Sequence, residues 1–173
     1  MTLLPDKEPI RTEEEGMKKL IFPFIIVLLS LSFVFGGEKR PPAPGPNDKC
    51  PVCGMFVKKY PDWVAGIIFK DGSGVFFDGA KDMFRYTLDL KKYNPQKSRS
   101  DIEAVYVTEY YRLTLMDGTK AFFVIGSDVL GPMGKELIPL AGDAEAKEFF
   151  KDHKGKRILT FKEVTPEVIK TLD

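Results

Sequence analysis

The residues with the clearest chemical capacity are two cysteines, Cys50 and Cys53, followed closely by Met55. The chain of 173 residues contains no other cysteine. Two thiolates and a thioether in one short segment form a soft-donor set, which selects Cu(I) or Zn over the hard cations that prefer carboxylate oxygen. Because a thioether offers little to zinc, Met55 favours copper. We therefore expect a Cu(I) site at Cys50, Cys53 and Met55.

The same cysteine spacing also serves other chemistry. It occurs in thioredoxin-like redox pairs, in local disulfides and in one half of a zinc site. A four-thiolate zinc site would need a second cysteine pair, which this chain lacks. A redox catalyst would need a thiol of lowered pKa, and the neighbouring Lys49 is a weak cause for that. The spacing alone leaves open a copper site, a thiol-disulfide oxidoreductase, and a structural module with a disulfide or zinc.

Composition narrows the class of protein. The chain is 43% hydrophobic and 29% charged with a formal net charge of +1, which suits one domain of ordinary size and argues against a nucleic-acid partner. His153 is the only histidine, so a histidine-rich metal site is excluded. It lies at the end of a predicted helix, where a cation interacts favourably with the helix dipole. We expect His153 to act either as this cap or as a copper ligand.

An uncharged apolar segment, residues 20–35, follows Lys18 and Lys19 near the start of the chain. Its length and its flanking lysines are typical of a signal-peptide core. We expect export to the periplasm, with residues 1–37 forming a leader and a signal peptide or membrane anchor. Residues 38–48 are proline-rich and are predicted to be an extended tether, which places the two thiols on an accessible loop directly after it.

The segment after the cysteines predicts a β-hairpin followed by a helix. Residues 63–69 and 75–78 are apolar runs on either side of Asp71-Gly72, a strong hairpin signal. A helix is expected from Gly79 onward. Residues 102–111 are again rich in strand-forming side chains, and residues 121–125 are expected to return after Asp117-Gly118.

The two halves of this region resemble one another at a constant offset. Asp71-Gly72, Phe76-Phe77 and Asp82 match Asp117-Gly118, Phe122-Phe123 and Asp128, each 46 positions later. We therefore predict an α+β domain, residues 49–165, built from two repeated ββα units. Asp82 and Asp128 are expected to be helix caps.

The end of the domain is expected to add a helix and a strand. Residues 143–154 are predicted to be a helix with Ala146, Phe149 and Phe150 facing inward. Residues 156–164 alternate as an edge strand does, and residues 166–173 are a tail with a final helical turn.

Five separate segments, in order, resemble the NosL family of copper-binding accessory proteins of nitrous oxide reductase. They are KCPVCGMFVKKYPDW, FFDGAKDMFRY, VTEYY, GSDVLGPMGKEL and DHKGKRILTFKEV. The resemblance covers residues 48–165. It implies a fold of paired ββα units, similar to part of organomercurial lyase, and a periplasmic, membrane-tethered Cu(I) chaperone without catalytic turnover.

The resemblance also implies partners and a further ligand. Its members work with a membrane complex of NosD, NosF and NosY during assembly of the copper centres of nitrous oxide reductase. The segment that contains Met133 lies near the metal site or the partner surface in the family, so Met133 is expected to join the copper ligands. Many members carry a lipid-modified cysteine at the signal cleavage point, and this chain has no cysteine there.

Overall fold

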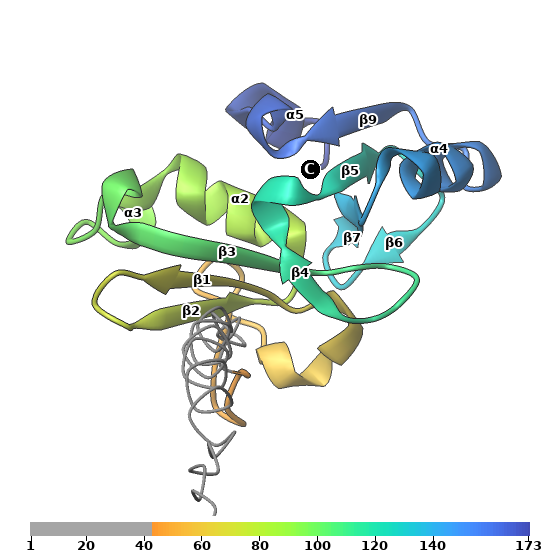
Figure 1. Cartoon of the computed structure of the whole chain (residues 1–173). Helices are drawn as coiled ribbons and strands as arrows, with labels where there is room; N and C mark the ends of the chain where they lie inside the picture. The colour runs from red at the N-terminus through yellow and green to blue at the C-terminus, as the bar shows by residue number, and fades with distance from the viewer. Residues whose placement is uncertain (1–42) are drawn as a thin grey trace, which may run out of the picture. The chain divides into compact units, whose positions relative to one another are not determined.

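Two main antiparallel sheets, and the helices that cover them, form residues 43–173, the part of the chain that the computed structural model describes (Figure 1). These residues belong to one compact unit. The predicted leader, the apolar segment and the first part of the tether lie outside the described residues. Within residues 43–173, no helix has the length and apolar character needed to cross a membrane. The predicted mixed α/β domain is confirmed.

The first sheet has the strand order β2-β1-β3-β4 and the second has the order β8-β5-β9. Their strands are β1 (Ala65–Phe69), β2 (Gly74–Phe77), β3 (Ile102–Thr108), β4 (Leu115–Asp117), β5 (Phe122–Ile125), β8 (Ile138–Leu140) and β9 (Arg157–Thr160). A small hairpin is formed by β6 (Leu130–Gly131) and β7 (Gly134–Lys135). The α-helices are α2 (Ala80–Leu88), α3 (Leu90–Tyr93), α4 (Asp143–Asp152) and α5 (Pro166–Lys170). Short 3-10 helices are η1 (Val57–Lys59), η2 (Pro61–Trp63), η3 (Arg99–Asp101), η4 (Gly118–Lys120) and η5 (Phe161–Glu163).

The hairpin predicted at Asp71-Gly72 is confirmed. Strands β1 and β2 pair antiparallel from Ala65 opposite Phe77 onward. The Asp71 carboxylate accepts hydrogen bonds from the Ser73 backbone N–H and hydroxyl, at 3.1 and 2.6 Å. Gly72 has a φ of +82°, a left-handed conformation that glycine adopts without steric cost. The turn therefore aligns β2 so that residue 78 emerges beside the start of α2.

The second predicted hairpin is wrong. Strand β4 pairs with β3, with Asp117 opposite Tyr106, and is the edge strand of the first sheet, whereas β5 belongs to the second sheet. The Asp117 side chain instead accepts the Thr119 N–H at 2.9 Å and starts η4. The chain then crosses to the second sheet, where β5 pairs with β8 and β9.

The two sheets nevertheless share one topology. In each, a central strand pairs antiparallel with two neighbours: β1 with β2 and β3, and β5 with β8 and β9. A helix follows the second strand of each set, α2 after β2 and α4 after β8. The equivalent elements are not those related by 46 positions, because Phe76-Phe77 lies in β2 whereas Phe122-Phe123 lies in β5, the counterpart of β1.

The alternation of side chains along β5 joins two apolar clusters. Phe123 and Ile125 face the main core, which contains Met83 and Phe84 of α2. Val124 points to the other side and packs with Phe149 of α4. Figure 1 shows α2 above the first sheet and α4 at the outer side of the second. The main core therefore holds α2 between the sheets.

Several local predictions at the end of the domain are confirmed. Helix α4 buries Ala146 and Phe149 and half-buries Phe150, and β9 is an edge strand. Residues 43–48 depart from a fully extended tether, because a turn is closed by the Asp48 N–H donating to the Gly45 carbonyl at 3.3 Å.

Candidate metal centre

The two cysteines lie on a tight turn, residues 49–56. The Cys50 N–H donates to the Met55 carbonyl and the Gly54 N–H donates to the Cys50 carbonyl, both at 2.8 Å. Gly54 has a φ of +81°, so the turn needs glycine at this position. Both ends of the turn are joined by a bridge between Lys49 and Phe56. This backbone geometry directs both thiols to one side of the turn, where each meets a carboxylate.

Each thiol meets a carboxylate from another part of the chain. Cys50 Sγ donates to Asp82 Oδ2 at 3.3 Å, and Cys53 Sγ donates to Asp78 Oδ1 at 3.2 Å. One ligand atom from each of these four residues lies within 4.8 Å of the other three. We call these four residues the Cys2Asp2 cluster. It is the one group of three or more His, Cys, Asp and Glu side chains that could hold a metal ion within residues 43–173.

The secondary structure positions the two carboxylates. Asp78 follows the last residue of β2, and Asp82 lies in the first turn of α2. Asp82 was expected to be a helix cap, and this prediction is wrong. The N-cap of α2 is Gly79, and the Asp82 side chain turns away from the backbone to Cys50 and to Arg85, whose Nη1 lies 3.4 Å from Asp82 Oδ1. Asp128 is also not a helix cap, because no helix starts there.

The Cys2Asp2 cluster is largely shielded from water. Cys50 is 1% exposed, and Asp78 and Asp82 are buried as well. Cys53 is half-buried and is the most accessible member. The expectation that both thiols are accessible is therefore wrong for Cys50. Its side chain is covered because the turn folds against the apolar core.

Burial changes the acidity of both thiols. Desolvation raises the pKa of Cys50 far above its usual value, and the negative charge of Asp82 adds to this effect. Desolvation, together with the hydrogen bond to Asp78, raises the pKa of Cys53 to about 12. Both thiols are therefore protonated near neutral pH and act as hydrogen-bond donors to the carboxylates.

The donor set fits a metal cation. Among the described residues, Asp78 Oδ2 is a buried oxygen without a hydrogen-bond partner. Such a group is costly unless something pairs with it, and a bound cation would do so. Two sulfur donors favour a soft ion, and the carboxylates beside them supply negative charge.

The other sequence-predicted ligands have different surroundings. Met55 is half-buried in the cysteine turn itself. Met133 is 42% exposed in the turn between β6 and β7, and its carbonyl accepts a hydrogen bond from Lys81 Nζ at 2.9 Å. Lys81 is adjacent to Asp82 in the first turn of α2. This hydrogen bond therefore joins the β6–β7 hairpin, which carries Met133, to the start of α2. The roles of Met55 and Met133 as ligands stay predictions.

His153 is placed with a different set of side chains. It is the C-cap residue of α4, as its predicted capping role requires. Its ring stacks on Phe149 with 4.3 Å between ring centroids, and Nδ1 lies 3.2 Å from Asp128 Oδ1. Its role as a copper ligand stays a prediction.

Asp78 and Asp82 were missed as site residues. The signal in the sequence was their spacing of four, immediately after a predicted strand and across a helix start. Nothing in the sequence linked them to the cysteines, which lie 25 and 32 positions away.

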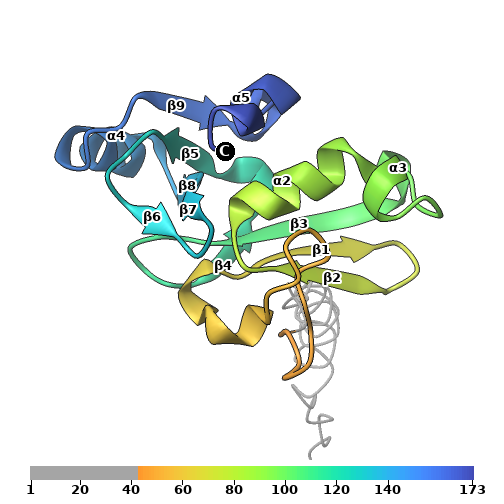
Figure 2. The same cartoon turned by 180° about the vertical axis from the view of Figure 1, so that it is seen from behind.

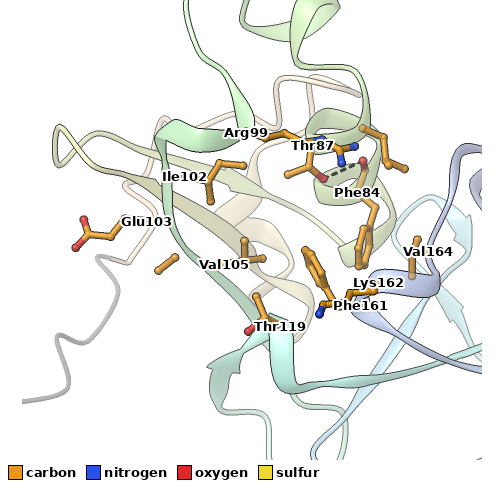
Figure 3. Close-up of a pocket in the computed structure, with 12 residues that line it drawn as sticks. Phe84, Thr87, Arg99, Ile102, Glu103, Val105, Thr119, Phe161, Lys162 and Val164 are labelled. Carbon is orange, nitrogen blue, oxygen red and sulfur yellow. Dashed lines mark hydrogen bonds between the residues drawn. The ribbon is translucent and has the colours of Figure 1, made fainter.

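A cavity of about 440 Å³ lies beside α2 but does not touch the Cys2Asp2 cluster. Figure 3 shows its apolar walls, which include Phe84, Val105 and Phe161. The Thr87 hydroxyl beside it donates to the Phe84 carbonyl at 3.0 Å. The cavity is therefore separate from the metal centre.

Comparison with known proteins identifies relatives of this chain. The copper-binding lipoprotein NosL of Stutzerimonas stutzeri is 29% identical over 153 residues, which is 81% of this chain and 77% of that protein. The crystal structure of the copper chaperone NosL from Shewanella denitrificans superposes with a TM-score of 0.62 at 23% identity, covering 75% of this chain and 98% of the other, and shows that the fold is shared. Residues 41–169 match the sequence model of the NosL family. The chain thus belongs to the NosL family.

Proposed function

We propose that this protein is a Cu(I) chaperone of the periplasm that carries one copper ion in the Cys2Asp2 cluster. The observation that carries this proposal is the convergence of two thiols and two buried carboxylates within 4.8 Å. The thiols are the soft ligands that Cu(I) prefers, and the carboxylates lie where they can orient them. Family membership supports the choice of copper, since the relatives are named as copper-binding proteins.

Transfer to a partner requires a path to the ion. Cys53 is half-buried and is the most accessible member of the cluster, so an incoming ligand reaches the ion on the Cys53 side. Low-coordinate sulfur ligation then allows stepwise exchange of one ligand at a time. Cys50, which is buried, would be the last protein ligand to dissociate from the ion. We propose that Met55 and Met133 add thioether ligands during loading or release.

The recipient that we propose is the machinery that assembles the copper centres of nitrous oxide reductase, a NosD, NosF and NosY-type membrane complex. The apolar segment, residues 20–35, is proposed to hold the domain at the membrane. Both proposals rest on the resemblance and on the lipoprotein relative. In cells, deletion of this gene should lower the copper content of nitrous oxide reductase, and a Cys50→Ser, Cys53→Ser copy should fail to restore it.

The oxidoreductase alternative is disfavoured by the site. An attacking thiol needs a lowered pKa and an exposed sulfur. Here burial raises the pKa of both thiols, and Cys50 is almost fully covered. Reduction of insulin disulfides by the protein, at a rate above that of free dithiol, would reopen this alternative.

Zinc is the second candidate ion, because the cluster offers four donors and structural zinc sites are four-coordinate. The two ions differ in the ligands they would use. Cu(I) is expected to bind the two sulfurs, whereas Zn would draw in the carboxylate oxygens.

The deciding experiment is a competition assay on the reduced, oxygen-free protein. A chromophoric Cu(I) chelator and a chromophoric zinc chelator are each titrated against the wild type and against the Cys50→Ser, Cys53→Ser double variant. Capture of one equivalent of Cu(I) by the wild type, lost in the double variant, supports the proposal. Capture of zinc in preference to copper, or equal capture by both proteins, contradicts it.

A further inference from the structure

The start of α2 carries an anchor that comes from the other half of the domain. The N-cap residue Gly79 has no side chain, so it cannot satisfy the free N–H groups of the first helical turn. Glu136, which lies between β7 and β8, accepts one of these groups. Its Oε1 accepts the Lys81 N–H at 2.6 Å, across 55 positions of sequence.

Glu136 is fitted closely into this position. It is 3% exposed, and the same Oε1 also accepts the Leu137 N–H at 2.9 Å. A Cβ atom on Gly79 would lie 2.3 Å from Glu136 Oε2, which is far inside van der Waals contact. The glycine is therefore needed for space, since its φ of −176° is open to any residue.

Lys81 provides a second connection from the same turn. Its buried side chain extends to the β6–β7 hairpin and to the C-terminus, where Nζ donates to the carbonyls of Met133 and Leu172 at 2.9 and 3.4 Å. Figure 2 shows the hairpin beside the start of α2. Both connections keep the first turn of α2 in one place.

The carboxylates of the candidate metal centre flank these anchored residues. Asp78 immediately precedes Gly79, and Asp82 immediately follows Lys81. A shift of the first turn of α2 would therefore move both carboxylates relative to the thiols. Among the hydrogen bonds described for residues 43–173, the bond from the Lys81 N–H is the one that joins the first turn of α2 to a buried carboxylate outside the helix.

We propose that Glu136 is a positioning residue of the metal centre. It binds no metal itself, and it acts by holding the first turn of α2 so that Asp78 and Asp82 face Cys53 and Cys50. This inference rests on the proposed function for the identity of the ion. Loss of a residue that orients metal ligands typically weakens metal binding by about 10- to 100-fold, which sets the expected effect here.

The chain offers a matched control for general loss of stability. Glu109 is a second buried carboxylate, 1% exposed, and its Oε2 accepts the Arg112 N–H at 2.6 Å. It holds the loop between β3 and β4 and makes no contact with α2 in any hydrogen bond or ion pair described for residues 43–173. Glu136→Leu and Glu109→Leu should both destabilise the fold, but only the first should disturb the metal centre.

The experiment compares the full-length wild type with Glu136→Leu, Glu136→Gln, Gly79→Ala and Glu109→Leu. Three quantities are measured for each: the Cu(I) affinity by chelator competition, the rate at which a thiol reagent modifies the cysteines of the copper-free protein, and the urea midpoint. We expect Glu136→Leu and Gly79→Ala to lower the copper affinity by about 10- to 100-fold and to increase thiol modification. Glu136→Gln keeps an acceptor oxygen and should stay within a few-fold of the wild type.

The control separates the possible outcomes. If Glu109→Leu loses as much copper affinity as Glu136→Leu at the same urea midpoint, the positioning role is wrong. The same conclusion follows if Gly79→Ala leaves both affinity and thiol modification unchanged. If the wild type captures no copper, the proposed function fails, and thiol modification still decides on the positioning role because it needs no metal.

Discussion

Cys50 and Asp82 are 32 positions apart in the sequence, and the buried thiol of one donates a hydrogen bond to the carboxylate of the other at 3.3 Å. This pair joins the turn after the tether to the first turn of α2. Together with the Cys53–Asp78 pair, it forms the Cys2Asp2 cluster, in which each thiol donates a hydrogen bond to a carboxylate.

The two cysteines should not contribute equally to copper binding. Cys50→Ser removes a ligand from the buried side of the cluster, where water cannot replace it, whereas Cys53→Ser leaves a position that solvent can reach. We expect both variants to lose copper affinity, with the larger loss for Cys50→Ser, by about tenfold or about 1.4 kcal/mol of binding free energy. Chelator competition on the two single variants measures this difference. Equal losses of copper affinity in the two variants would show that the burial of a cysteine does not affect its contribution to copper binding.

Copper affinity should rise with pH. Both thiols are protonated at neutral pH, because burial raises the pKa of Cys53 to about 12 and that of Cys50 well above its ordinary value. Binding must therefore displace protons, and each displaced proton strengthens binding by about tenfold per pH unit below the thiol pKa. The measurement is the Cu(I) affinity from pH 6 to pH 9, corrected for the chelator's own pH dependence. An affinity that is constant over this range would contradict the protonated thiols.

Asp78→Asn should make Cys53 more acidic. The Asp78 carboxylate accepts the thiol hydrogen and so favours the neutral form of Cys53, which contributes to its raised pKa. Removing the negative charge should lower this pKa and increase the rate of alkylation at a fixed pH near 8. The Cys50→Ser background isolates the signal of Cys53. An alkylation rate that is unchanged or slower in Asp78→Asn would exclude the carboxylate as a cause.

Folding stability should depend on Glu136 below neutral pH. Desolvation raises the pKa of Glu136 to about 7. The hydrogen bonds from the Leu137 and Lys81 N–H groups lower this pKa, but desolvation has the larger effect. The folded state therefore holds this proton more tightly than the unfolded chain does. The contribution is fully present below the unfolded pKa near 4.5 and is lost as pH rises through 7, so stability should fall over that window.

Urea unfolding at several pH values tests the Glu136 contribution. The slope between pH 4.5 and pH 7 should be smaller in Glu136→Gln, which carries no titrating group at this position. Glu109→Gln serves as the comparison. If wild type and Glu136→Gln give parallel profiles, the titration of Glu136 does not contribute.

His153→Gln should leave copper binding within about threefold of the wild type, a difference of about 0.6 kcal/mol. Its ring is stacked on Phe149 and paired with Asp128, away from the Cys2Asp2 cluster. A large loss of copper affinity in His153→Gln would show that the histidine is a ligand.

Met55→Leu and Met133→Leu, measured in the same assay, test the thioether ligands. We expect both variants to bind copper more weakly than the wild type.

Much of this protein follows from local sequence. The hairpin at Asp71-Gly72, helices α2 and α4, the buried face of α4 and the choice of Cys50 and Cys53 as candidate ligands follow from turn residues, hydrophobic spacing and thiol chemistry, which act over a few positions. The offset of 46 positions also predicted a second hairpin at Asp117-Gly118, and this prediction is wrong. There the Asp117 side chain caps η4, and the chain continues into β5 of the other sheet.

Only the tertiary structure decided which carboxylates join the thiols. Asp82 reads locally as a helix cap, but the N-cap of α2 is Gly79, and Glu136, from the segment between β7 and β8, accepts the Lys81 N–H. The Asp82 side chain is then available to Cys50. Pairings of this kind depend on packing between segments that are distant in the chain, and no local pattern of residue types encodes them.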